Sequence, residues 1–412
     1  MKISFISIYN FFIYTILVLN LGFFNLIYQS DRIAFKISIV LALIVFIIYT
    51  FQPNKISVKK SISLYLILCL SLFMIEFLRN SRPFVISNED LIYQFGGVFL
   101  CLVLFPINEI LSSDKKTFLT NLVVMGYIIL LIKATVWFLY NFLQINIAPG
   151  IWGYKIDWAR EIFGHVFTRL SGTFLDSYLL IYSFYTMISK DKEINKRIYA
   201  GIGLLFLFFY ATVVTQYRMI VVLYLLTILL LIFILSYKSK NKAASLILLL
   251  LILCLLLIIN RAGIKSFISS FSVNNNITGG STSFRLLELD FFKSLWLQNN
   301  IGLGFGFIPD KVIPYNGAGY YLSDLGFTAN LYQFGIIGFA ILIFPFLMGI
   351  KLSLIHLSKS NISNNKLYFI FVGLTIYIVM SLLPYSPYNP SLVSLMPIYL
   401  AILNSCELDF RQ

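Results

Sequence analysis

The sequence predicts an all-α integral membrane protein, and three observations predict it. Hydrophobic types make up 59% of the 412 residues and charged types only 12%, about half of the ~25% that soluble domains carry. Apolar runs of about 20 residues, the length that spans a hydrocarbon core of ~30 Å, recur along the chain. The net charge is +14, and the cations fall mostly in the connections between these runs. An ordinary soluble enzyme and a nucleic-acid-binding protein are excluded, because little of the chain remains for a wet surface.

Taken in order, the apolar runs predict about twelve spans within one polytopic domain, residues 1–412. The first run is too long for the core of a signal peptide and is not followed by a small-residue cleavage site. The seventh and eighth meet at Tyr217 and Arg218, so eleven spans is the alternative. The twelve are 4–28, 33–52, 61–78, 91–107, 118–143, 172–189, 198–216, 219–236, 243–260, 323–350, 367–383 and 391–405.

Lys and Arg in the short connections predict the orientation. With the N-terminus in the cytoplasm, every internal cytoplasmic loop is basic and its cations are mostly Lys, so we predict that both termini are cytoplasmic. A planar guanidinium that grips phosphate at two points favours a phosphorylated ligand on the outer side. The alternative is that these groups reach lipid phosphates. Eight of the ten Arg fall there: Arg32, Arg79, Arg82, Arg160, Arg169, Arg218, Arg261 and Arg285.

Two outer connections are too long to be simple links. The first, 144–171, gathers Trp158, Arg160, His165 and Arg169 in a short stretch. Aromatic faces beside Arg suit sugar rings and phosphates, and an interfacial helix with an aromatic belt is the alternative. The connection therefore predicts a binding segment on the outer side.

The second outer connection, 260–322, predicts an amphipathic helix over 284–297. Such a helix can lie along the membrane surface. The predicted apolar stripe is Leu286, Leu289, Phe292 and Trp296. The predicted polar side is Arg285, Glu288 and Lys293.

Glycines at 302, 304 and 306 follow this helix and permit close approach of the backbone to a ligand. They follow no predicted strand, so a dinucleotide-binding fold is excluded. Asp324 opens the tenth predicted span, where it can serve as a general base, or simply cap the helix. One carboxylate and several Arg form a minimal set for displacing a pyrophosphate. The sequence predicts no metal site and no cofactor.

These elements resemble the signature region of the O-antigen polymerase and ligase superfamily. That region is matched by Gly302, Gly304 and Gly306, then Asp324, then Gly335 and Gly338. Arg169-Leu-Ser-Gly-Thr-Phe and Thr215-Gln-Tyr-Arg218 are similar to two further family segments, with Tyr217 replacing Ser. The motifs touch about a fifth of the chain. Asp324 stands where the ligases carry His, which favours the O-antigen polymerase (Wzy-type) branch.

The resemblance implies a membrane-embedded glycosyltransferase of the lipid-linked-donor (GT-C-like) type. It would join oligosaccharide repeat units carried on undecaprenyl pyrophosphate, by inverting, metal-independent transfer, at the outer face of the bacterial cytoplasmic membrane. The product would be O-antigen or capsule. Membrane lipids, a chain-length regulator and a flippase are the candidate partners, besides the lipid-linked glycans. The alternatives are a ligase that transfers glycan to lipid A core or protein, and a flippase or other transporter of lipid-linked oligosaccharide.

We assign roles as hypotheses. Asp324 and Arg285 are the candidate catalytic residues, with Asp324 as the base. Arg169 and Arg218, together with Arg285, would hold the donor pyrophosphate. The candidate substrate-binding residues are Arg169, Arg218, Arg160, His165, Trp158, Gly304 and Gly306.

Overall fold

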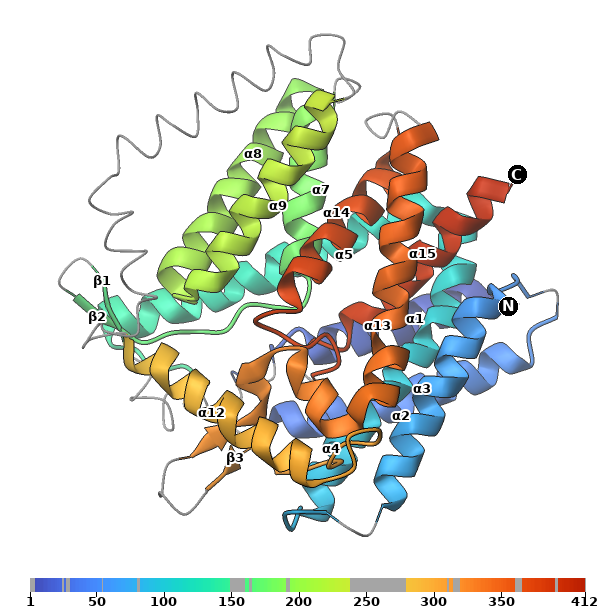
Figure 1. The fold of residues 1–412 in the computed structure, drawn as a ribbon. Helices are drawn as coiled ribbons and strands as arrows, with labels where there is room; N and C mark the ends of the chain where they lie inside the picture. The colour runs from blue at the N-terminus through green and yellow to red at the C-terminus, as the bar shows by residue number, and fades with distance from the viewer. Residues whose placement is uncertain are drawn as a thin grey trace.

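The computed structural model describes residues 4–23, 26, 30–53, 55–79, 82–148, 160–162, 165–189, 193–237, 279–309, 311–313, 319–359, 365–389 and 392–411. Within these ranges the chain is mostly helical. The helices pack around one large hydrophobic core, with α12 and the short strands at one side of the bundle (Figure 1).

The helical elements share no single length or direction, and several are interrupted. They are α1 (Phe5–Asn20), α2 (Ser30–Thr50), α3 (Lys60–Leu78), α4 (Asn88–Leu100), η2 (Cys101–Val103), α5 (Leu104–Leu143), α7 (Asp176–Ile188), α8 (Ile194–Phe209), the π-helical η4 (Tyr210–Val214), α9 (Arg218–Tyr237), α12 (Gly279–Gln298), η5 (Leu322–Leu325), α13 (Thr328–Lys359), α14 (Lys366–Ser381) and α15 (Leu395–Arg411). The strands form two antiparallel pairs: β1 (Arg160–Ile162) with β2 (His165–Phe167), and β3 (Lys311–Val312) with β4 (Tyr320–Tyr321).

Six helical stretches of the described chain are long and apolar enough to cross a membrane, which confirms the prediction of an all-α protein with membrane-spanning helices. Each predicted span overlaps a helix except 243–260, which lies outside the described residues. The number of spans stays a prediction. The six stretches are Arg32–Thr50, Lys60–Leu78, Asn88–Leu143, Ile194–Val214, Arg218–Ser236 and Thr328–Leu357.

Two helices have boundaries that differ from the predicted ones, and each is interrupted by a sharp break. The helix that begins with α4 continues through the connection expected near 108–117 and turns only at Asp114, whose φ of −146° and ψ of 65° are not helical. Its carboxylate accepts the Thr117 N–H at 3.1 Å and so caps the next helical stretch. The tenth span was expected from 323, but α13 begins at Thr328 and is broken at Gly335.

A polar network ties residues near both chain ends to one end of the bundle. The Tyr9 hydroxyl donates to Gln52, whose amide donates to Glu109 at 3.2 Å. The backbone N–H of Lys59 donates to Asn404 at 3.0 Å. The connection between α2 and α3, which holds both Gln52 and Lys59, therefore lies beside residues close to both termini.

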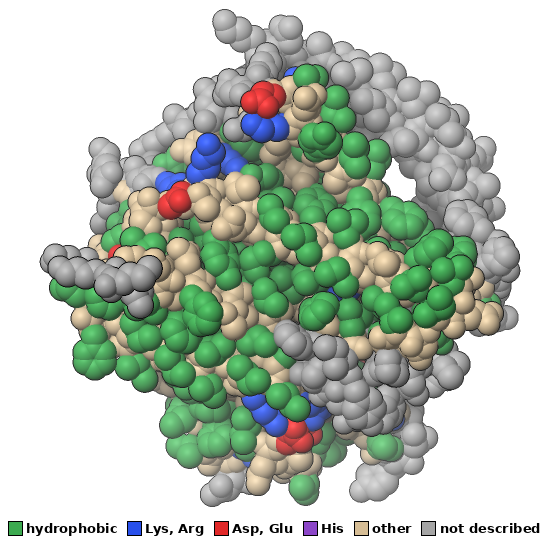
Figure 2. Space-filling view, turned by 180° about the vertical axis from the view of Figure 1, so that it is seen from behind, with side chains coloured by type: hydrophobic (Ala, Val, Ile, Leu, Met, Phe, Trp, Pro, Cys, Tyr) green, Lys and Arg blue, Asp and Glu red, His purple; other side chains and the backbone are tan. Residues whose placement is uncertain are grey.

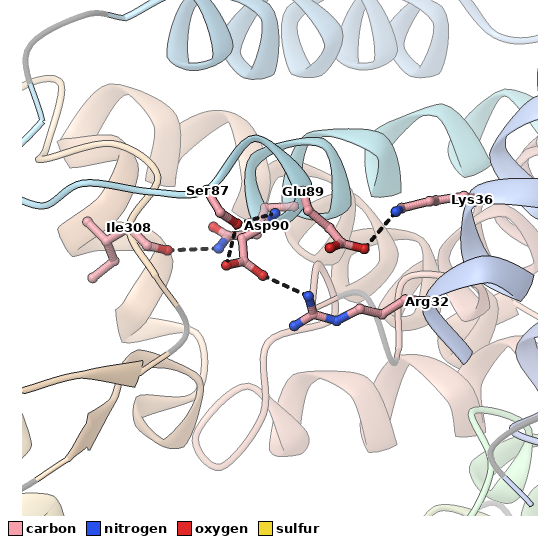
Figure 3. Close-up of polar contacts among 7 residues, drawn as sticks. Arg32, Lys36, Ser87, Glu89, Asp90 and Ile308 are labelled. Carbon is pink, nitrogen blue, oxygen red and sulfur yellow. Dashed lines mark hydrogen bonds and ion pairs between the residues drawn. The ribbon is translucent and has the colours of Figure 1, made fainter. Parts of the chain in front are cut away.

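The other end of α2 carries two ion pairs with the start of α4 (Figure 3). Arg32 lies 3.0 Å from Asp90 and Lys36 lies 2.8 Å from Glu89. Figure 2 shows the face behind that of Figure 1. On it, charged side chains gather toward the two ends and hydrophobic side chains occupy the band between them. This distribution suits a bundle whose middle faces lipid.

The helix expected over 284–297 lies within α12, and three residues of the predicted apolar stripe, Leu289, Phe292 and Trp296, pack in or against a second small core beneath it. Two residues differ from the prediction: Leu286, expected on the apolar side, is 49% exposed, and Glu288, expected on the polar side, is fully buried. That core includes Phe292, Phe305, Ile308, Val312, Tyr320, Leu322, Leu325, Ala329 and Tyr332.

Candidate functional site

Arg169 lies in an extended segment whose backbone is anchored on both sides of it. Trp137 Nε1 donates to the Thr168 carbonyl at 2.8 Å, and the Leu170 N–H donates to the Val214 carbonyl at 3.0 Å. Lys133, which is buried, donates to the carbonyls of Ser171 and Gly172 at 3.3 and 2.9 Å. The backbone that carries Arg169 is thus held in place before any ligand binds.

The partner of Leu170 is available because the helix ends at Val214, the last residue of η4, so its carbonyl has no helical donor. Within η4 the Thr215 N–H reaches back to the Tyr210 carbonyl at 2.9 Å, the wider π-helical spacing. Gln216 then takes a left-handed φ of 56°. This change of direction brings the Tyr217 ring to 5.3 Å from the Arg169 guanidinium carbon.

The three Arg predicted to hold a pyrophosphate come from different elements. Arg218 begins α9 and lies within electrostatic reach of both Arg285 and Arg169. Arg285 is exposed in the first half of α12. Their binding of pyrophosphate stays a prediction. Burial lowers the pKa of Arg169 from its ordinary value, while Tyr217 opposes that change. Three guanidinium groups from distant parts of the sequence therefore share one region.

Two carboxyl groups, Asp324 and Glu288, lie within electrostatic reach of each other, and Glu288 also lies within reach of Arg285. Asp324 is exposed in η5, so it does not cap α13, which begins at Thr328. Glu288 accepts the Tyr321 N–H at 2.9 Å through Oε1, and its buried Oε2 has no hydrogen-bond partner among the described residues. Burial, with a further contribution from the Asp324 charge, raises the pKa of Glu288 to about 7, although Arg285 acts in the opposite direction.

Tyr385 connects this charged region to a cavity of about 310 Å³ inside the bundle. It lies within electrostatic reach of Tyr217, Arg285 and Asp324, and burial is the main cause that raises its pKa above the ordinary value. Tyr217 also lines the cavity, as do Lys133 and Asp176. The cavity thus extends from the arginine cluster toward two buried charged groups.

Gly304 and Gly306 have a structural role in the described chain. Their φ angles are 68° and 79°, and the Gly306 N–H donates to the Gln333 carbonyl at 2.7 Å. A Cβ on Gly304 would lie 2.3 Å from the same carbonyl oxygen. The loop therefore supplies partners for backbone groups freed where α13 breaks at Gly335. Binding of substrate by these glycines stays a prediction.

The remaining predicted residues belong to the first outer connection. Arg160 lies in β1 and His165 in β2, where His165 pairs with Ile162 and Arg160 pairs with Phe167. The described part of this connection is a strand pair and not an interfacial helix. Trp158 lies outside the described residues.

Sequence reasoning missed the roles of Glu288, Tyr385 and Lys133. A signal existed for Lys133, because a cation inside an apolar run usually faces a cavity or a partner. The sequence signal for Glu288 was weaker: it follows Arg285 by about one helical turn, so the two side chains can lie on the same face. Nothing in the sequence singled out Tyr385.

No protein-family model matches the chain, and no curated protein matches it. The family resemblance thus rests on the short motifs alone, and the function has to be argued from the site.

Proposed function

We propose that the protein is a polysaccharide polymerase. It joins oligosaccharide units carried on undecaprenyl pyrophosphate, at the outer face of the bacterial cytoplasmic membrane, to make O-antigen or capsule. The observation that carries this proposal is that Arg218 lies within electrostatic reach of Arg169 and Arg285, and that Arg285 and Asp324 both lie within reach of Tyr385 and Glu288. Like charges at short range repel one another, so the arrangement favours a multivalent anion bound among them. A pyrophosphate has that charge and geometry.

In the proposed reaction an acceptor sugar hydroxyl attacks the anomeric carbon of the donor glycan. A new C–O bond forms while the bond from that carbon to the pyrophosphate oxygen breaks, and the electron pair leaves with the lipid pyrophosphate. The hydroxyl proton passes to the Asp324 carboxylate. The three Arg balance the charge that develops on the leaving group. Attack from the face opposite the leaving group inverts the anomeric configuration.

Glu288 is the buried member of a pair of carboxyl groups whose exposed member is Asp324. Burial raises the pKa of Glu288 to about 7, and the Asp324 charge adds to that change. Burial thus favours the protonated form of Glu288, and the exposed Asp324 is the carboxylate that we assign as the base.

The test is a polymer-length assay with the purified full-length chain and lipid-pyrophosphate-linked repeat units. Asp324→Ala should lower the rate by about 100-fold or more, the usual effect of losing a general base. Asp290→Ala is the matched control, because Asp290 is exposed on α12. Full-length polymer from Asp324→Ala at normal protein level would remove Asp324 from the mechanism.

Arg→Lys at positions 169, 218 and 285 tests the anion site separately. Lys keeps the charge but loses the planar fork, so each variant should lose activity if pyrophosphate is held at two points. Arg197→Lys is the control, since Arg197 donates to the Met187 carbonyl at 2.9 Å near the start of α8. Unchanged activity in all three variants would mean that these Arg only help to set the orientation of the chain in the membrane.

A transporter of lipid-linked oligosaccharide is the second candidate. The break of α13 at Gly335 and the buried Lys133 and Asp176 favour it, because transporters use broken helices and buried charges near their sites. Proteoliposomes loaded with the lipid-linked unit on one leaflet distinguish the two: a transporter moves the unit without lengthening it. Adding lipid A core as acceptor to the polymer assay distinguishes a ligase.

A further inference from the structure

A second cavity, of about 240 Å³, lies between α4, α13 and the turn that precedes α15. Its volume is several times the ~30 Å³ that one water occupies in the liquid, so it holds more than a single solvent molecule. Ser323, the residue before Asp324, lines it. Tyr93 lines this cavity and the larger one. The second cavity therefore reaches the residue next to the proposed base.

Uncharged amides and hydroxyls supply the polar part of its lining apart from one ion pair, Arg32 with Asp90. Gln94 and Gln333 face each other with 3.5 Å between the Gln333 nitrogen and the Gln94 oxygen, the limit of a hydrogen bond. Asn330 donates to the Ser386 hydroxyl at 2.7 Å. Amides both donate and accept, so the weak Gln333 contact can be exchanged for two bonds to neighbouring hydroxyl groups of a ligand.

Aromatic rings form much of the remaining lining, including Tyr93, Phe307, Phe334 and Tyr388. A sugar ring has C–H faces that pack on such rings and an edge of hydroxyl groups that pair with amides. The charged lining residues, Arg32 and Asp90, are 3.0 Å apart and neutralise each other (Figure 3). A neutral ligand therefore fits this cavity better than an anion, in contrast to the arginine cluster.

We propose that this cavity binds the acceptor sugar, a neutral sugar residue at the end of the incoming lipid-linked unit, and presents its hydroxyl to Asp324. This assignment rests on the proposed glycosyl transfer, and it separates the two substrates. The donor pyrophosphate would lie among Arg169, Arg218 and Arg285, none of which lines this cavity, and the acceptor sugar would lie in the cavity that Ser323 borders.

Binding is measured with the full-length chain in nanodiscs free of sugar-headed detergent. The probe is the delipidated repeat-unit oligosaccharide, prepared by hydrolysis of the host's own surface polysaccharide. Gln333→Met and Gln94→Met keep side-chain length and remove the amide. Each should weaken binding about threefold to tenfold, the value of one net hydrogen bond. Gln298→Met, at the exposed end of α12, should bind like the wild type.

The same variants in the polymer assay should raise the acceptor KM more than they lower kcat, because the base and the Arg are untouched. If the wild type, Gln333→Met and Gln94→Met bind the oligosaccharide equally, the acceptor site is overturned. Polymer formation by the wild type would then still support the proposed glycosyl transfer. Conversely, selective loss of binding in the two variants, with no lengthening by the wild type, overturns the glycosyl transfer and keeps a sugar site.

Discussion

The Tyr217 ring lies 5.3 Å from the guanidinium carbon of Arg169. The two residues come from different connections, and the π-helical turn at the end of α8 brings them together. A ring in this position contacts the guanidinium and orients it.

Loss of that ring should weaken activity modestly. A cation–π contact of this kind contributes about 0.5–1 kcal/mol at exposed sites, so Tyr217→Leu should lower polymer formation about twofold to fivefold. Tyr217→Phe keeps the ring and should stay near wild type. Tyr199→Leu is the control, because Tyr199 is 71% exposed on α8. Equal loss in the Leu and Phe variants would assign the effect to the hydroxyl and not to the ring.

Glu288 predicts a pH dependence of stability. Its pKa is raised from 4.5 to about 7, mainly by burial. Between these two values the folded chain holds a proton that the unfolded chain has released, so the free energy of unfolding falls as pH rises through this window. The titration of Glu288 should therefore make the melting temperature of the wild type lower at pH 8 than at pH 5, by on the order of a few °C. Glu288→Gln is neutral throughout and should show a smaller difference.

Thermal melts of both proteins in the same detergent check this prediction. Glu407→Gln, on the last helix, serves as the control for removing a carboxylate elsewhere. If the melting temperatures of the wild type and Glu288→Gln changed equally with pH, the pKa of Glu288 in the folded chain would be the ordinary one.

Hydropathy sufficed to predict where the helices lie. Residue type and predicted side of the membrane separate eight Arg from the Lys, and the family motifs single out Arg169 and Arg218 among them; their role in a site stays a prediction. The burial of Glu288 could not be predicted, because it depends on a distant segment that includes Tyr321, whose N–H Glu288 accepts. Periodicity alone places a charged residue on the wet face.

The sequence contained a partial signal for the breaks in the helices. Gly335 has φ of 63°, and glycine adopts this conformation without strain. However, the break also needs Gly302 to Gly306 to receive its unpaired backbone groups, and that pairing joins segments some thirty residues apart. The change of direction at Asp114 had no comparable marker, because the same residue type often lies on the surface of a continuous helix.

Gly304→Ala should destabilise the fold. Its φ of 68° disfavours any side chain, and the added Cβ would lie 2.3 Å from the Gln333 carbonyl oxygen. Strain of this kind costs about 1–3 kcal/mol, so we expect a lower melting temperature and less folded protein. Gly201→Ala is the matched control, since its Cβ would meet only Met187 Sδ at 3.9 Å, and it should be neutral or stabilising in a helix. Equal melting temperatures for the two variants would contradict the close packing of this loop.

Lys133 and Asp176 should behave as a coupled unit. Lys133 holds the carbonyls of Ser171 and Gly172, and its charge acts on Asp176, which in turn binds Thr173. Removing one member of a buried charge pair leaves the other uncompensated, at a cost of about 3–5 kcal/mol. Lys133→Met should therefore lower the melting temperature far more than Lys36→Met, which removes only an exposed ion pair with Glu89.

The double variant Lys133→Met with Asp176→Asn decides whether charge or packing is responsible. If charge dominates, the second change removes the uncompensated carboxylate, and the double variant should be more stable than Lys133→Met alone, by more than about 1 kcal/mol beyond additivity. Additive losses would mean that each side chain acts only through its own bonds to the segment from Ser171 to Thr173. Either way, both variants loosen the backbone next to Arg169, so polymer formation should fall further than folded protein does.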